Sequence, residues 1–251
     1  QRLIQLAAIN NPEKIIPSFM EFVDIAGLVK GAHSGEGLGN KFLSHIRETQ
    51  CFAHVVRCFD DENVIHVEGK ISPINDLETI ETELMLSDLE ILEKRIEKIE
   101  KQLRNGDKAL KEEFDCLMEI KNQISTNGFK ANLASEDLQS HLKNLQLITA
   151  KSFFYIANLH EDDSKNLYIN ELEEHAKKTN TELIKVFAKA ESELIDLENE
   201  ERNEYLEMLG IKEPTLDVII KKGYSLLNLF SYFTAGPKEV RAWSVKNGAK
   251  A

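Results

Sequence analysis

The chain has 251 residues, of which 42% are hydrophobic and 29% charged, an ordinary composition for a globular protein that buries a proper core. Its 43 acidic and 31 basic residues give a net charge of −12, which repels a phosphate backbone and argues against direct, sequence-specific DNA binding. No stretch approaches the roughly 20 apolar residues that cross a bilayer, so a membrane-spanning helix is excluded. We therefore expect a cytoplasmic protein.

The first predicted elements alternate between strands and a helix. Apolar runs at Met20–Val23 and Phe52–Phe59 predict two buried strands. Between them, Gly39–Arg47 has the apolar spacing of a helix, preceded by a stretch that is dense in glycine. Strand, helix, strand is the local order of an α/β domain.

A heptad-like stripe begins at about Leu77 and indicates long helices. After a turn at Asn105–Asp107, a second apolar face continues to Asn127–Gly128. The pattern predicts an antiparallel helical hairpin, which is either a structural arm with solvated faces or a specific partner-binding arm. The first stripe alternates intervals of four and three residues, with charged residues on the other faces: Met85, Leu89, Leu92, Ile96, Ile99 and Leu103.

Strands and helices alternate again after the hairpin. Ser152–Ala157 and Glu182–Phe187 are predicted strands, with a helix at Tyr168–Lys178 between them. The helical hairpin is thus interpreted as an insertion into an α/β domain. Near the end, Tyr232–Gly236 and Glu239–Val245 predict a β-hairpin with too few strands to bury a core alone.

The first candidate for chemistry is Asp24-Ile25-Ala26-Gly27, at the end of the first predicted strand. A carboxylate at the carboxyl end of a parallel strand, followed by a glycine that allows close approach, suits Mg²⁺ binding and γ-phosphate sensing. Several glycines between Gly31 and Gly39 would let the following loop reorder when phosphate binds. The motif also occurs in many loops without function, and a flexible connection is the alternative.

The second candidate is Asn158-Leu159-His160-Glu161, directly after a predicted strand. Guanine-specific P-loop proteins have Asn-Lys-x-Asp at this place, and the aspartate accepts hydrogen bonds from guanine. Leu159 and Glu161 replace the lysine and the aspartate, so guanine selectivity loses its physical basis. Ala188-Lys189-Ala190-Glu191 follows the next predicted strand, where a short backbone loop would cover the base.

Together these runs resemble the Obg-like ATPase family, YchF group, which are P-loop NTPases of the TRAFAC class. The resemblance rests on Phe22–Gly31, Gly35–Leu43 and Asn158–Glu161, and it extends through Phe233–Trp243, so it covers essentially the whole chain. It implies an α/β fold, a P-loop NTPase-like sheet with helices on both faces, interrupted by an antiparallel coiled-coil hairpin and followed by a β-rich TGS domain. It also implies hydrolysis of ATP in preference to GTP, with Mg²⁺, and association with ribosomes.

The resemblance assigns a domain to each part of the chain. Residues 1–76 are expected to be the first part of the nucleotide-binding domain, and residues 148–227 its second part. Residues 77–147 form the inserted helical hairpin, and residues 228–251 the beginning of a TGS domain.

The resemblance also assigns functional residues. Leu28 stands where signalling GTPases carry a glutamine that orients the attacking water. The matching catalytic residue in the family is a histidine outside this loop, which corresponds to His66, while a surface or packing role for His66 is the alternative. The remaining expected roles are γ-phosphate sensing by Asp24 and Gly27, metal binding by Asp24, and base binding by Asn158, Leu159, Glu161 and Ala190.

Two departures from the family pattern concern segments rather than single residues. The Walker A spacing, Gly-x-x-x-x-Gly-Lys-Ser/Thr, occurs nowhere in residues 1–251, and only the opening of the TGS domain is present. The Walker A loop supplies the amides, the lysine and the hydroxyl that hold phosphates and Mg²⁺. We therefore expect a chain truncated at both ends that does not hydrolyse ATP by itself. The alternative function is a non-catalytic fragment or degraded copy that binds ribosomes or proteins.

Overall fold

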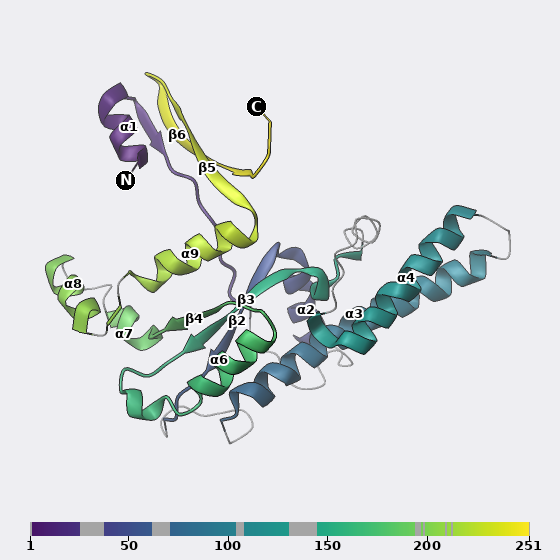
Figure 1. Cartoon of the computed structure of the whole chain (residues 1–251). Helices are drawn as coiled ribbons and strands as arrows, with labels where there is room; N and C mark the ends of the chain where they lie inside the picture. Colours follow the sequence, from purple (N-terminus) through teal and green to yellow (C-terminus); the bar gives the residue numbers. More distant parts are fainter. Residues whose placement is uncertain are drawn as a thin grey trace. The chain divides into compact units, whose positions relative to one another are not determined.

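The computed structural model describes residues 2–25, 38–61, 71–103, 108–130, 145–193, 197, 199–208, 210–211 and 213–250. The chain forms two compact units, traced in Figure 1. The larger unit comprises residues 25–197, and the smaller unit combines residues 1–24 with residues 198–251.

The larger unit is built on a parallel sheet in the order β2–β3–β4 (Figure 1). Its strands are β2 (Cys51–Arg57), β3 (Ser152–Asn158) and β4 (Leu183–Val186). The central strand β3 reads as a continuous apolar run because a strand inside a parallel sheet is covered rather than alternately exposed. Helix α6 (Ile169–Lys178) connects β3 to β4. These elements confirm the predicted α/β class.

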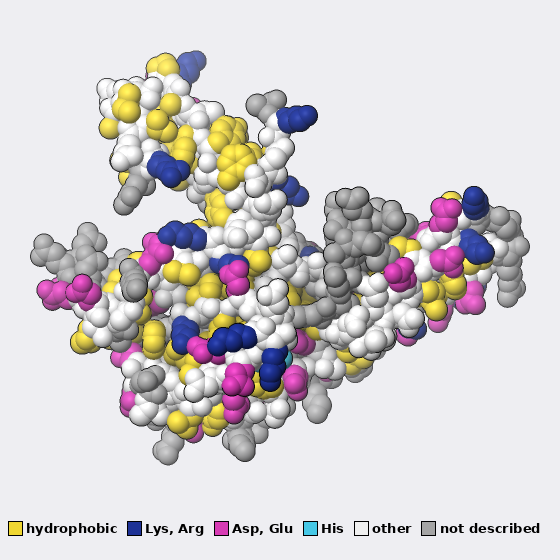
Figure 2. Space-filling view, viewed as in Figure 1, with side chains coloured by type: hydrophobic (Ala, Val, Ile, Leu, Met, Phe, Trp, Pro, Cys, Tyr) yellow, Lys and Arg dark blue, Asp and Glu magenta, His cyan; other side chains and the backbone are white. Residues whose placement is uncertain are grey.

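Three further helices of this unit were predicted. Helix α2 (Leu38–Glu48) precedes β2, and the long helices α3 (Pro73–Leu103) and α4 (Lys108–Asn127) form the antiparallel hairpin. Figure 2 shows acidic and basic side chains interspersed over this hairpin, as expected for solvated helix faces. The apolar stripes meet in a core of mostly buried residues: Leu92, Ile96, Ile99, Leu117, Ile120, Ile124 and Leu147.

A buried polar cluster joins the hairpin to the sheet. The Asp88 carboxylate of α3 is fully buried and accepts a hydrogen bond from Arg47 Nη1 of α2 at 2.6 Å. Its other oxygen accepts bonds from the backbone N–H and the hydroxyl of Thr149, at 2.7 and 2.8 Å. Arg47 Nη2 also donates to Ser87 Oγ at 2.7 Å. Each buried charge therefore has a partner, which burial requires.

The smaller unit contains a sheet in the order β1–β6–β5. Strands β5 and β6 are antiparallel and confirm the predicted hairpin, while β1 adds a parallel strand beside β6. The elements of this unit are α1 (Arg2–Asn10), β1 (Lys14–Ile16), α8 (Asn199–Met208), α9 (Thr215–Leu226), β5 (Leu229–Ala235) and β6 (Glu239–Lys246).

The prediction of a buried strand at Met20–Val23 is wrong. These residues are irregular, and the side chains of Phe22 and Val23 are 53% and 57% exposed. A strand exists only through pairing, and residues 20–23 pair with no strand of the described chain. The pairing of β1 with β6 also differs from expectation, because it gives the C-terminal hairpin a third strand.

The compact units and the predicted domains do not coincide at the start of the chain. Residues 1–24 group with residues 198–251, whereas the sequence placed residues 1–76 in one domain. Among the described helices, none is both long and apolar enough to cross a membrane. The boundaries at residues 76, 147 and 227 stay a prediction.

Candidate functional site

The carboxyl ends of β3 and β4 meet at one edge of the larger unit's sheet. Their parallel register aligns Asn158 with Val186, and the N–H of Leu159 donates to the C=O of Val186 at 2.8 Å. In open α/β sheets, ligands bind outside the carboxyl ends of the strands. The two loops selected from the sequence therefore begin side by side at the edge where a ligand is expected.

Asn158 connects the loops on either side of it. Its side-chain Oδ1 accepts a hydrogen bond from the N–H of Ala188, the first residue of α7 (Ala188–Glu193), at 3.4 Å. Its backbone C=O accepts a bond from the N–H of Cys58, just past β2, at 3.0 Å. The side-chain bond is long and correspondingly weak. Asn158 thus bridges the ends of three neighbouring strands.

The other predicted base-binding residues differ in what they offer a ligand. Leu159 is 6% exposed and its side chain packs in the core around β3, while Ala190 is fully buried. A ligand at the surface would meet these two residues through their main chain rather than through their side chains. Glu161 is exposed and presents a carboxylate.

A buried side chain that the sequence analysis missed, Asn166, holds the loop after β3. Its Oδ1 accepts a hydrogen bond from the N–H of His160, and its Nδ2 donates to the C=O of His160, both at 2.8 Å. Asn166 is 7% exposed. The available signal was an asparagine closing a polar loop, since Asn side chains often replace backbone partners there.

A tight turn stands between these two residues. Asp162 Oδ1 accepts hydrogen bonds from the hydroxyl and the N–H of Ser164, at 2.6 and 3.0 Å. These bonds hold the pKa of the Asp162 carboxyl below its usual range. The N–H of Asp162 donates to Nδ1 of His160 at 2.9 Å. The turn, which continues into a short 3₁₀ helix at Asp163–Lys165, is therefore exposed and negatively charged at neutral pH.

Of the three residues predicted to act at the phosphates, the structure describes only Asp24. Asp24 is exposed and belongs to the smaller unit, while Gly27 and His66 lie outside the described residues. An exposed carboxylate fits Mg²⁺, which takes one or two protein carboxylates and completes its shell with phosphate oxygens and water. The described ranges contain no group of three or more His, Cys, Asp or Glu side chains that could hold a metal alone.

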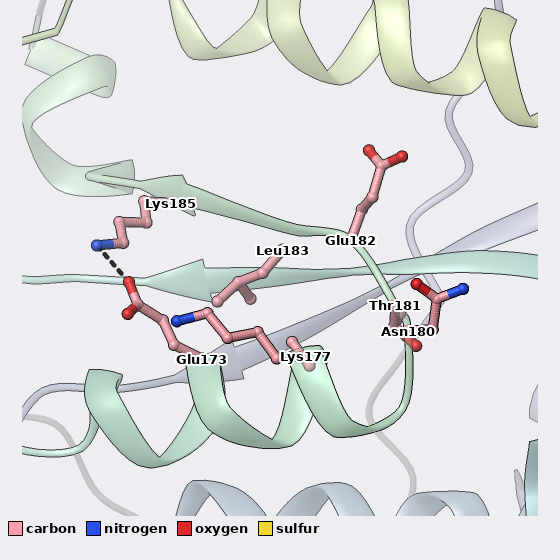
Figure 3. Close-up of a pocket in the computed structure, with 8 residues that line it drawn as sticks. Glu173, Lys177, Asn180, Thr181, Glu182, Leu183 and Lys185 are labelled. Carbon is pink, nitrogen blue, oxygen red and sulfur yellow. Dashed lines mark ion pairs between the residues drawn. The ribbon is translucent and has the colours of Figure 1, made fainter.

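A shallow depression runs along β4, between that strand and α6 (Figure 3). Glu173 and Lys185 form an ion pair across it at 2.7 Å, and the hydrogen bond from Lys185 lowers the pKa of Glu173. Asn180, Thr181 and Glu182, which line it, come before β4 rather than after it. Its lining residues extend from before β4 to Lys185 and include none of the described residues of Asn158–Glu161 or Ala188–Glu191.

Comparisons with known proteins cover the whole chain. No family model matches it. It is 48% identical over 255 residues to the ribosome-binding ATPase YchF of Bacillus subtilis (strain 168), spanning 100% of this chain and 70% of the relative. The corresponding protein of Haemophilus influenzae is 48% identical over 253 residues, covering 100% and 69%. The solved structure of the Schizosaccharomyces pombe YchF GTPase matches with a TM-score of 0.84 and 35% identity, over 100% of this chain and 69% of that one.

Proposed function

Because this chain belongs to the YchF family, we propose that it is part of a switch protein that hydrolyses nucleotides and associates with ribosomes. Within that protein, its base-binding loop selects ATP in preference to GTP. Relatives named as an ATPase and as a GTPase make nucleotide hydrolysis the activity common to the family. The preference for ATP is the specific part of the proposal.

The observation that carries the proposal is the loop Asn158–Glu161 at the carboxyl edge of the sheet. Leu159 is buried in the core, so no lysine side chain is available there to lie along a guanine base. Glu161 is one methylene longer than the aspartate that pairs with guanine, so its carboxylate does not occupy the same place. A site that lacks matched acceptors leaves the polar edge of guanine unpaired, and this discriminates against GTP.

The phosphate side of the proposal rests on the sequence and its relatives. Asp24 would hold the Mg²⁺ that accompanies ATP, and Gly27 would lie at the γ-phosphate. His66 positions the attacking water, because Leu28 has no polar group for this task. When bound, Mg²⁺ neutralises charge that develops on the phosphates during transfer. Association with ribosomes places the protein in the cytoplasm.

The test compares ATP and GTP affinities by calorimetry, using the protein expressed from its complete coding sequence. We expect ATP to bind more tightly, and Glu161→Asp, which changes an exposed side chain, to shift the balance towards GTP. Adding Leu159→Lys should increase this shift, provided thermal melting shows that the double variant folds. The matched control is Leu167→Lys with Glu171→Asp, which makes the same changes at exposed positions of the same segment. Tighter binding of GTP by the unaltered protein contradicts the proposal.

A second arm of the same experiment addresses His66. Replacing His66 by Ala should lower kcat by about 10²-fold or more while nucleotide affinity changes little, the pattern of a group used in the transition state. Unaltered turnover would assign His66 to packing or to the surface.

A further inference from the structure

We infer that Asn166 is a positioning residue for base selectivity, because its side-chain amide holds the main chain of His160 between the two residues that meet the base. The inference rests on the proposed function. It extends that function to a residue that is not part of the base-binding motif and that lies beyond the turn at Asp162–Ser164.

The side chain of Asn166 bonds to His160 as a neighbouring strand would, because it accepts from the N–H and donates to the C=O of the same residue. A carboxamide carries one acceptor and one donor side by side, as a peptide group does. Asn166 uses both on the same residue, accepting from the N–H of His160 and donating to its C=O at 2.8 Å each. Because Asn166 is 7% exposed, water competes little for either bond.

Holding both main-chain groups of His160 fixes two peptide planes. The N–H of His160 belongs to the plane shared with Leu159, and its C=O belongs to the plane shared with Glu161. Leu159 is already fixed from the other side by its bond to the C=O of Val186. Asn166 therefore helps to set the direction in which the chain reaches Glu161, together with the bond from the Asp162 N–H to Nδ1 of His160 on the far side of Glu161.

A second set of contacts also holds the loop, but it does not involve the main-chain groups of His160. The N–H of Asp60, after β2, donates to the C=O of Lys165 at 3.2 Å, and the ring of Phe59 lies against the ring of His160 at a centroid distance of 5.7 Å. These contacts hold the far arm of the loop and the imidazole, but not the peptide planes around His160. Selectivity between bases depends on acceptors that are oriented before binding, and Asn166 supplies that orientation.

The decisive variant is Asn166→Asp, which keeps the size and the acceptor but places a carboxylate oxygen against the C=O of His160. We expect the ratio of ATP to GTP affinity, measured by calorimetry on the protein from its complete coding sequence, to fall by about tenfold, as expected for one lost hydrogen bond. Asn170→Asp, at an exposed position of α6, makes the same charge change and should leave the ratio unaltered. The exchange rate of the His160 amide hydrogen should rise in Asn166→Leu, which removes the acceptor.

Each outcome separates selectivity from stability. Equal weakening of both nucleotides, with a lower Tm and an unchanged ratio, would assign Asn166 a structural role and overturn the inference, as would an unchanged exchange rate at His160. An unaltered protein that does not prefer ATP overturns the proposed function, and the selectivity role of Asn166 with it, before any variant is measured. If Asn166→Leu does not fold, the ratio in Asn166→Asp still decides.

Discussion

The two ends of β3 carry polar networks of opposite character. Before the strand, Asp88 accepts hydrogen bonds from Thr149 and from Arg47, which lie 61 and 41 positions away from it in the chain, and its carboxylate is fully buried. After the strand, the bonds between His160 and Asn166 span only six positions, in a loop that is largely exposed. The buried network joins distant segments, whereas the local network shapes one loop at the carboxyl edge of the sheet. Variants should therefore affect stability at one end and ligand choice at the other.

The largest effect is expected for Asp88→Ala. The variant leaves the guanidinium of Arg47, whose side chain is 13% exposed, without its carboxylate, and leaves the N–H of Thr149 without an acceptor. We expect the free energy of unfolding, measured in urea, to fall by about 3–5 kcal/mol. Glu90→Ala is the control, because Glu90 pairs with Lys94 at the exposed surface of the same helix and should cost about 0.5 kcal/mol or less. A loss of similar size in the two variants would remove the distinction drawn between buried and exposed networks.

An intermediate effect is expected midway along the sheet, where His54 of β2 is aligned with Tyr155 of β3. Burial lowers the pKa of His54 to about 4, from 6.5. The unfolded chain therefore binds a proton at a higher pH than the native protein does. Stability from this residue is complete above about pH 6.5 and is lost as the pH falls towards 4, by at most about 3 kcal/mol.

The measurement is urea unfolding across this pH range. His54→Phe keeps a ring beside Tyr155 but removes the imidazole, so the slope of stability against pH should become smaller. Some slope should remain, because acidic groups elsewhere in the protein also titrate. An identical slope in the unaltered protein and in His54→Phe would show that the imidazole is protonated in the native state over the same range.

The smallest effect is expected for Asp162→Asn in the loop after β3. The amide still accepts from Ser164, and the group is exposed, so Tm should not change measurably. The hydrogen bonds from Ser164 lower the pKa of Asp162, so this carboxyl keeps its charge to a lower pH than an ordinary aspartate does. A fall in Tm comparable with that of Asp88→Ala would mean that the loop supports the fold after all.

Features that depend on residues close together in the sequence were predicted more successfully than features that depend on distant residues. The hairpin and β3 were predictable because their patterns lie in contiguous residues, and the meeting of Asn158 with Ala188 followed from the edge that parallel strands share. The strand at Met20–Val23 was wrong because an apolar run does not name its partner. The cluster around Asp88 was missed because its partners lie 41 and 61 positions away, and nothing in the local pattern distinguishes a buried aspartate from a solvated one. The bonds of Asn166 are local, but an asparagine in a polar loop indicates a hydrogen bond to the main chain without naming its partner.

The buried cluster at Asp88 also has a consequence for the order in which the protein folds. Helices α3 and α4 separate β2 from β3 in the chain, and strands so far apart normally pair slowly because a long loop must close first. The hairpin, however, forms from contacts between two helices that are neighbours in the sequence. Asp88 of α3 then accepts a hydrogen bond from the N–H of Thr149, three residues before β3 begins. Once the hairpin has closed, the effective loop between the two strands is much shorter than the chain between them. We therefore expect the inserted hairpin to add much less to the loop that the central strands must close than its length in the sequence suggests.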